Sequence, residues 1–339
     1  MLRCIFFAGA LLALPAFAQT VAPEMTREQK LTQYRHDQIN LLALRPEPDS
    51  VLSAALLAEP DVDDKARPAV LKPAALLKRA QDIGENSPLV WWVTAAAECR
   101  AAAAKPCPST ETLQKLESLD AENAAVWTLS LWHAQQAKDA PSARAALASA
   151  AQAKRYSDYF GGLVAALYAA QDVLPMSNEL LAATGADASV PGYRLITAAN
   201  VVLKQVALPG GRAVLEACKP SEPADDAVVA DCIAVARKME LSGSMFAQSA
   251  GLSLREALLP PGPERDALGL RKRNLAWQMQ RMGELAGKLA NDVAVTRTYT
   301  NALAASGDES AAVYAVLRSQ GVSLEPPADW HPAPSPAQP

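Results

Sequence analysis

Few residues of this chain have the types and spacing to carry chemistry, and the cysteines are the most informative of them. Four follow the first eighteen residues: Cys99, Cys107, Cys218 and Cys232. Four thiols can bind zinc, or they can form two disulfide bonds in any of three pairings. Zinc is disfavoured, because the chain has no Cys-x-x-Cys pair and three histidines. The spacing favours the local disulfides, 99 with 107 and 218 with 232.

Each local pairing makes a demand on the helices around it. A continuous helix would hold Cys99 and Cys107 about 12 Å apart, whereas a disulfide needs Cα atoms within roughly 7 Å. The helix must therefore end between them, and Lys105-Pro106 is a suitable place. The second pair flanks the proline-rich stretch 219–226, which would turn one helix back on the next. Each bond would stabilise the fold by roughly 2–3 kcal/mol if loop closure dominates.

The amino terminus predicts a compartment in which disulfides form. The first eighteen residues have the three parts of a signal peptide: a start with one positive charge, an apolar run over 4–14 and the small-x-small pattern at 16–18. We therefore expect a signal peptide over 1–18, cleaved before Gln19. The apolar run is shorter than the about 20 residues that span a bilayer. We expect a periplasmic or secreted protein with no membrane span after cleavage, and the signal style and alanine content favour a bacterial envelope.

Catalytic and cofactor motifs do not stand out. Residues 243–244 and 307–310 do not fit the nucleophile elbow Gly-x-Ser-x-Gly. Residues 209–212, Pro-Gly-Gly-Arg, open a helix whose amides could hold an anion, but they lack the Walker spacing and its lysine, which favours a plain turn. His36 and Asp37 are neighbours on a helix and point about 100° apart, so they form no acid–base pair. We predict no catalytic, cofactor-binding or metal-binding residue.

The tryptophans are the most suggestive side chains for binding. Trp91, Trp92, Trp127 and Trp132 could line a groove that grips a peptide or glycan, because indoles offer a large contact area at low entropic cost. The helix expected over 122–138 is apolar on two faces, as a helix within a stack would be. We therefore favour packing in the core for these rings, and for His133 beside them.

Composition predicts an all-α fold and argues against nucleic acid as a partner. The net charge is −4 and no long basic run is present, whereas phosphate binding needs a concentrated basic face. Half of the residues are hydrophobic but 5% are aromatic, because alanine supplies much of the apolar count. Alanine is the best helix former, and alternating strand-like runs are absent. Arg271-Lys272-Arg273 with Arg281 forms a basic face that suits solubility or an acidic partner.

Caps and breakers place the helices. Thr26 and Gln29 form a capping box before a helix that runs to about residue 44, and Ser87-Pro88 opens another helix. Further helices are expected at about 50–58, 73–83, 109–119, 122–138, 142–153, 158–171, 176–183, 193–207, 211–218, 226–240, 245–258, 264–289, 291–305 and 309–319.

These helices form one helical region over 19–324. Breakers gather at 183–192 and at 259–263, and either stretch is a candidate sub-boundary. The last fifteen residues, 325–339, are rich in proline and polar residues. We expect them to form a disordered tail.

Internal repetition gives the chain a resemblance to a known family. The stretch 119–127, LDAENAAVW, resembles the junction between two tetratricopeptide repeats, and 84–88 is a similar junction. Trp92 precedes Trp127 by 35 residues, close to the family period of about 34. With Trp127 as the aromatic position of a first helix, the small and bulky positions of the second helix fall on Ala143, Leu147 and Ala150. The likeness covers 72–153, with a weaker echo over 291–319, and the cysteine pairs also resemble exported Sel1-like repeats.

The resemblance implies a fold and a kind of work. It implies an array of antiparallel helical hairpins, a short α-solenoid, whose first helices form a concave surface that holds a protein or peptide. We therefore expect an exported, non-catalytic binding or scaffolding protein of the cell envelope. A glycan-acting envelope enzyme is the alternative, and it needs two carboxyl groups about 5–10 Å apart across a cleft. A structural accessory subunit that docks through its tail is another.

Overall fold

The computed structural model describes residues 25–58, 71–102, 106–206, 208–219 and 225–332. Within these ranges the chain forms seventeen α-helices and no β-strand, which confirms the all-α prediction. No helix in them combines the length and apolar character that crossing a membrane requires. The expected signal peptide, 1–18, lies outside the described residues.

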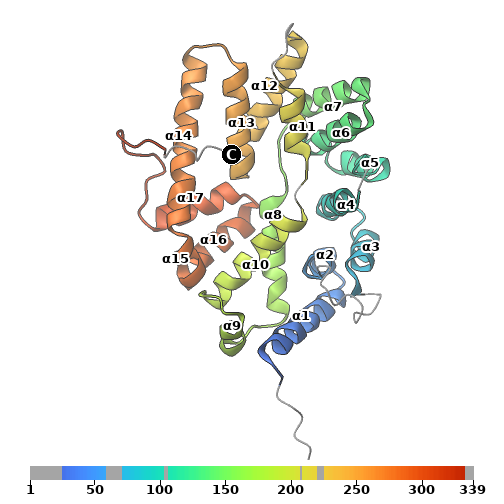
Figure 1. The fold of residues 1–339 in the computed structure, drawn as a ribbon, viewed down its shortest axis with the longest axis vertical. Helices are drawn as coiled ribbons and strands as arrows, with labels where there is room; N and C mark the ends of the chain where they lie inside the picture. The colour runs from blue at the N-terminus through green and yellow to red at the C-terminus, as the bar shows by residue number, and fades with distance from the viewer. Residues whose placement is uncertain (1–24, 59–70, 103–105, 207, 220–224, 333–339) are drawn as a thin grey trace, which may run out of the picture.

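Figure 1 shows the arrangement of the helices. Their bounds are α1 Arg27–Ala43, α2 Pro48–Leu57, α3 Pro73–Ile83, α4 Pro88–Ala101, α5 Thr110–Asp120, α6 Ala124–Ala137, α7 Ala140–Gln152, α8 Phe160–Ala170, α9 Asn178–Thr184, α10 Val190–Gln205, α11 Gly210–Ala217, α12 Asp226–Glu240, α13 Met245–Leu258, α14 Pro263–Glu284, α15 Ala286–Asn291, α16 Val293–Ser306 and α17 Glu309–Ser319.

Local signals in the sequence set most of these ends. The capping box before α1 is present, because Thr26 and Gln29 exchange backbone-to-side-chain hydrogen bonds of 2.8 and 3.2 Å. One prediction differs: the single helix expected over 264–289 is two helices, α14 and α15, that meet at Leu285. Glycines at 283 and 287 flank this joint and weaken the helix there.

Among the first seven helices, α2 packs against α1 and α3, α4 packs against α5, and α6 packs against α7. In Figure 1 they run up one side of the molecule from α1 to α7. The helices α2, α4 and α6 contact later parts of the chain, namely α8, α10 and α11. The inner face of these first helices is therefore packed against the protein itself.

Side-chain hydrogen bonds fasten this inner face. On α10, Gln205 donates its amide to the carbonyl of Leu56 on α2 at 2.5 Å, and its own carbonyl accepts from Arg100 on α4 at 2.7 Å. On α6, Gln135 donates to the carbonyl of Ala213 on α11 at 3.0 Å. The surface on which the repeat resemblance would place a partner is thus occupied by α8, α10 and α11.

Two helical hairpins, α12 with α13 and α16 with α17, dominate the second half. Arg271 and Lys272, two residues of the basic face expected on α14, have acidic partners on neighbouring helices. Glu240, 3% exposed, accepts ion pairs from Arg255 and Arg271, and Lys272 pairs with Glu256. The charges of this face therefore join α12, α13 and α14 to one another.

Both disulfides join the predicted partners. The Cα atoms are 5.0 Å apart in Cys99–Cys107 and 5.7 Å apart in Cys218–Cys232. As the first pair requires, the helix that carries Cys99 ends at Ala101. Paired cysteines agree with an oxidising compartment.

The segment 325–332 is ordered along α14. Arg273 donates hydrogen bonds to the carbonyls of Ala328 and Trp330 at 3.0 and 2.9 Å. The ring of Trp330 meets that of Trp277 edge-on, with centroids 5.3 Å apart.

This packing corrects the expectation of a disordered tail over 325–339. Proline lowers the entropy that a chain loses on ordering. In addition, Arg273 and Trp277 on α14 contact the segment and hold it in place. The remainder of the expected tail, 333–339, lies outside the described residues.

Candidate functional site

A repeated hydrogen-bond pattern fixes the role of two tryptophans. The indole N–H of Trp91 donates to the carbonyl of Glu85 at 2.9 Å, and that of Trp127 donates to the carbonyl of Ala121 at 2.8 Å. Each ring therefore covers the turn that leads into its own helix, α4 or α6. Both are partly exposed structural residues.

A second pair of bonds has the same spacing. Gln81 donates to Thr94 at 2.9 Å, and Ser130 donates to Glu117 at 2.5 Å, so each first helix is tied to the helix before it at matching positions. Each of the two contacts thus recurs once, at an offset of 36 residues. The helix pairs α3–α4 and α5–α6 therefore share two side-chain contacts at matching positions.

This offset corrects the predicted register by one residue. Trp91, not Trp92, is the equivalent of Trp127, and Trp92 corresponds to Thr128. Trp92 is 3% exposed and Thr128 is fully buried, so the core packing expected for the tryptophans holds for Trp92, whereas Trp127 is only partly buried. Ala150 is fully buried, and Ala143 is partly buried.

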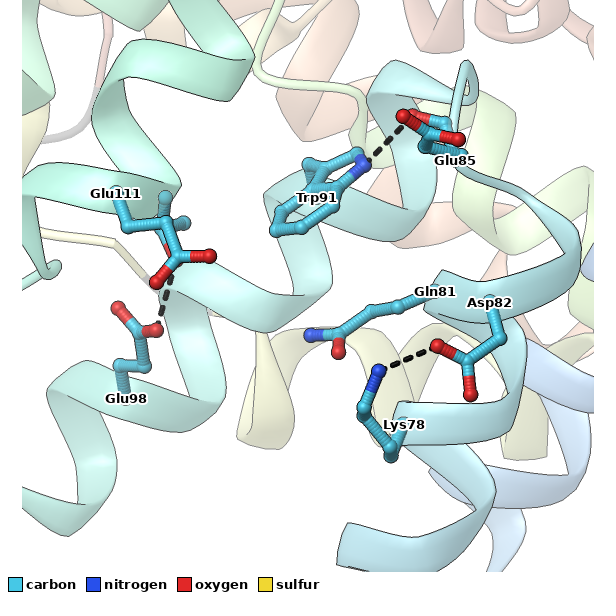
Figure 2. A pocket seen from close by; sticks show the side chains of 8 residues that line it. Lys78, Gln81, Asp82, Glu85, Trp91, Glu98 and Glu111 are labelled. Atoms are coloured by element: carbon cyan, nitrogen blue, oxygen red, sulfur yellow. Dashed lines mark hydrogen bonds and ion pairs between the residues drawn. The ribbon is translucent and has the colours of Figure 1, made fainter.

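A polar hollow of about 390 Å³ lies beside Trp91, between α3, α4 and α5 (Figure 2). Two of its carboxylates have partners that join the surrounding helices. Glu98 accepts from the backbone of Ser109 and the hydroxyl of Thr112, both at 2.7 Å, and so caps α5. Glu85 pairs with Lys115 at 3.0 Å. Glu85 and Glu98, two carboxylates of this hollow, are therefore already engaged by neighbouring groups.

A larger cavity, of about 530 Å³, lies between the early helices α4 and α6 and the later helices α8, α10 to α14 and α17, which we call the two halves of the molecule. Its lining includes the polar side chains of Thr128, Tyr156, Asp158, Arg212, Ser244 and Glu309, together with the indole of Trp92 and the two glycines Gly210 and Gly211. Its apolar lining includes Phe160, Leu163, Val202, Leu203, Val206, Leu208, Met239, Met245, Phe246 and Met279.

The joint between α7 and α8 brings one wall of this cavity into place. Asn123, fully buried, binds Ser157 through both of its amide atoms, at 3.0 and 2.8 Å, and also donates to Asp120. Arg155 adds an ion pair to Asp120 at 2.6 Å. Every polar atom of the buried Asn123 side chain is thus satisfied, which fixes the path of the joint.

Tyr159 holds an uncommon backbone conformation at the end of this joint. Its φ is +57°, in the left-handed region that a bulky residue rarely adopts. Its hydroxyl donates to Asp120, and its ring lies 5.0 Å from that of Trp92. These contacts hold the turn that sets Asp158 in the cavity wall.

Two carboxyl groups, Asp158 and Glu309, meet in the cavity from distant parts of the sequence. Asp158 accepts from the backbone of Phe160 at 3.2 Å and bonds the Ser244 hydroxyl. Glu309 accepts from the backbone of Met245 at 3.0 Å. The two acids therefore sit at the beginnings of α8, α13 and α17.

Burial changes the acidity of this pair. Desolvation raises the pKa of Asp158 above its ordinary value, and desolvation followed by the charge of Asp158 raises the pKa of Glu309. Tyr156 nearby is also buried, which raises the pKa of its phenol. The lining thus holds protonatable groups in apolar surroundings, an arrangement that often marks a functional site.

The Pro-Gly-Gly-Arg turn explains why α11 reaches the cavity. A Cβ atom on Gly210 would lie 2.4 Å from the Thr128 hydroxyl, so the close approach of α11 to α6 requires glycine. Gly211 lines the cavity and has open space around the position of its missing side chain. Arg212 pairs with Glu216 at 2.7 Å and lies over the Trp132 ring.

The other residues weighed from the sequence lie apart from the cavity lining. His133 is 2.7 Å from the carbonyl of Pro108, in keeping with the packing role predicted for it, and the four cysteines are in disulfides. His36 is on α1. Across the described ranges, no three or more His, Cys, Asp or Glu side chains gather as metal ligands would.

Comparison with known proteins finds no family model, no curated protein and no solved structure that matches this chain. The site must therefore be interpreted from its own chemistry. Among the described residues, the lining of the cavity combines two carboxyl groups with apolar side chains and contains no histidine or cysteine. Sequence reasoning missed Asp158 and Glu309. The one local signal for them was that each lies beside a helix start.

Proposed function

We propose that this chain is an exported, non-catalytic binding protein of a bacterial cell envelope, and that it holds a segment of a protein or peptide in the cavity between its halves. The observation that carries the proposal is the apolar lining of that cavity, which continues into exposed side chains. Phe246 is 77% exposed, Leu203 59% and Met279 48%. Exposed apolar groups gathered around a pocket are typical of a binding site.

The place of binding differs from the one that the repeat resemblance implies. The inner face of α2, α4 and α6 is occupied by α8, α10 and α11. The cavity has Trp92 of α4 and Thr128 of α6 in its lining, together with residues from α8, α10, α11, α13 and α17. The array would therefore serve as the support for a site that the later helices complete.

A cavity-filling variant tests the proposal. Gly211 lines the cavity and has open space at its side, so Gly211→Phe can occupy the cavity without a backbone clash. We expect the wild type to bind the neutral apolar dye N-phenyl-1-naphthylamine with enhanced fluorescence, and the variant to lose at least about tenfold in affinity. Gly269→Phe is the matched control, because Gly269 on α14 has equally open space and does not line the cavity.

A photo-cross-linking amino acid then locates the natural partner. Placed at Phe246, it should yield an adduct in the native compartment, and Gly211→Phe should abolish that adduct. The same amino acid placed at the exposed Leu41 on α1 should yield no adduct. Dye binding that is equal in both glycine variants would contradict the proposal.

A glycan-acting enzyme is the second candidate, and the meeting of Asp158 and Glu309 is the observation in its favour. Glycoside hydrolysis uses two carboxyl groups, one of them with a raised pKa. Here both groups also accept hydrogen bonds from helix-start amides, which suits a structural role. Release of reducing ends from cell-wall glycan by the wild type, lost in Glu309→Gln, would establish the enzyme.

A further inference from the structure

The carboxyl-terminal segment 325–332 lies on the surface of α14, as a bound peptide lies on a protein (Figure 1). Pro326 and Trp330 are half-buried, and the other six residues of the segment are exposed. Just before the segment, Val322 and Leu324 pack against the hydrophobic core. The segment is therefore held by surface contacts alone, beyond a fixed point at Leu324.

Most of these contacts are hydrogen bonds to backbone carbonyls. The guanidinium of Arg273 donates to the carbonyls of Ala328 and Trp330 at 3.0 and 2.9 Å. It also donates to the carbonyl of Pro327. A turn gathers these carbonyls, because the backbone N–H of Trp330 donates to the carbonyl of Pro327 at 3.1 Å. Main-chain contacts of this kind recognise the shape of a peptide and not its side chains.

One side chain of the segment is recognised by aromatic contact. Trp330 meets Trp277 edge-on with ring centroids 5.3 Å apart, and the guanidinium of Arg273 lies 6.0 Å from the centroid of Trp330. Arg281 lies 5.0 Å from the centroid of Trp277 and supports that ring. Arg273, Trp277 and Arg281 recur every four residues, so they share one face of α14. An aromatic ring on the ligand is the part that this face selects.

Charge and exposure add to this description of a ligand. The segment carries two acids, Glu325 and Asp329, and the face that holds it carries Arg273 and Arg281. Leu270 precedes Arg273 by three residues on the same face and is 62% exposed. The face therefore continues past the turn and offers an apolar contact to a longer ligand.

We propose that Arg273, Trp277 and Arg281 form a docking site for a segment of a partner protein. That segment has a proline-containing turn, acidic charge and a tryptophan, and residues 325–332 compete with it for the same site. A segment without buried contacts can detach while the rest of the fold stays intact. The partner makes the same contacts and gains one more by reaching Leu270. The three side chains do not line the cavity, so this inference goes beyond the proposed function and does not depend on it.

A peptide copy of the segment tests the site. The probe is the fluorescein-labelled peptide EPPADWHP, which is residues 325–332, and its binding to the full chain is measured by fluorescence polarisation. The variant Trp330→Ala keeps the docking site and weakens the hold of the chain's own segment. We expect this variant to bind the probe at least about fivefold more tightly than wild type. An edge-on aromatic pair is worth about that factor, and a tethered segment competes at a high effective concentration.

Variants of the peptide and of the protein identify the groups that bind. The peptide EPPADAHP lacks the ring of Trp330 and should bind about fivefold more weakly. EPPADWAP lacks the exposed imidazole of His331 and should bind as well as the probe. In the Trp330→Ala protein, Arg273→Ala should weaken the probe at least about tenfold, the scale of hydrogen bonds to a charged group. Arg297→Ala removes an exposed arginine on α16 and should have no effect.

The outcomes decide between the docking site and its alternatives. Equal binding of the probe to wild type and Trp330→Ala, or no binding to Trp330→Ala, overturns the site. Equal binding of EPPADWHP and EPPADAHP overturns it too, as does binding that survives Arg273→Ala in a protein whose circular dichroism shows unchanged helix content. A wild-type dimer by light scattering that Trp330→Ala dissociates would identify a second copy as the occupant and overturn the assignment to a different protein.

Discussion

At the scale of single residues, Asp158 and Glu309 carry the most chemical information in this protein. Each lies at a helix start, where a carboxylate is ordinarily stabilised. Burial has the opposite effect and raises the pKa of both groups. Desolvation therefore outweighs the capping hydrogen bonds in this cavity. Such a balance is common where a protein keeps acids for binding and not for stability.

The raised pKa predicts how stability responds to pH. In the folded state Asp158 and Glu309 hold their protons more strongly than in the unfolded chain, so their contribution to stability is fully present below the ordinary carboxyl pKa of about 4. It is lost as the pH rises through the raised values. Once ionised, both acids lower the stability of the fold, because their charges lie in apolar surroundings beside Tyr156 and Tyr299.

Asp158→Asn should therefore raise the free energy of unfolding at pH 7, and the difference from wild type should shrink as the pH falls toward 4. Urea denaturation at a series of pH values measures this difference. Comparing the two proteins at each pH cancels the effect of other carboxyl groups. A variant that is less stable than wild type at pH 7 would show that the hydrogen bonds of Asp158 outweigh its desolvation.

At the scale of helices, the sequence predicts what local chemistry decides. Thr26 with Gln29 places the start of α1, and Ser87-Pro88 places that of α4, because caps act within one turn. The break at Leu285 was missed, since glycine only weakens a helix and the surrounding packing decides where it ends.

The recurring contacts are offset by 36 residues, whereas the sequence analysis paired Trp92 with Trp127 at 35. An aromatic residue was expected once per repeat, but two adjacent tryptophans offered two choices, and period alone could not separate them. Hydrogen bonds decide between them, because Trp91 and Trp127 each reach the carbonyl six residues earlier. Trp92 does not cover such a turn and instead lines the cavity.

The tight packing of α6 against α7 supports a prediction at this scale. Ala150 is fully buried on α7, whereas Ala145 on the same helix is exposed. Ala150→Leu should lower the free energy of unfolding by about 1–3 kcal/mol through overpacking. Ala145→Leu should change it by less than about 0.5 kcal/mol, as a surface substitution does. Chemical denaturation of the two variants measures both, and equal effects would contradict the close packing at Ala150.

At the scale of the whole molecule, the decisive features lie beyond what the sequence could reveal. Asp158 and Glu309 are separated by nine helices, α8 to α16, and nothing in their local sequence indicates that they meet. The covering of α2, α4 and α6 by α8, α10 and α11 is equally non-local. The sequence therefore predicted an open array, whereas the folded chain covers the inner face of that array itself.

The carboxyl-terminal segment supports the last prediction, because its composition and its structure disagree. Composition predicts disorder from Glu325 onward, yet Arg273 and Trp277 on α14 hold the chain through Trp330. An edge-on aromatic pair is worth about 1 kcal/mol beyond its buried area. Trp330→Ala should therefore lower the free energy of unfolding by ~1 kcal/mol.

The same substitution should expose the segment to protease. Limited proteolysis, followed by mass spectrometry, should cut Trp330→Ala and Arg273→Ala near residues 325–332 faster than wild type. His331→Ala, a change at the exposed neighbour, should leave the rate unchanged. If wild type and all three variants were cut equally fast, the segment would be as disordered as its composition predicts. Faster cleavage of the two contact variants alone would show that α14 holds the segment 325–332 in an ordered conformation. A partner that docks on this segment would then bind an ordered chain.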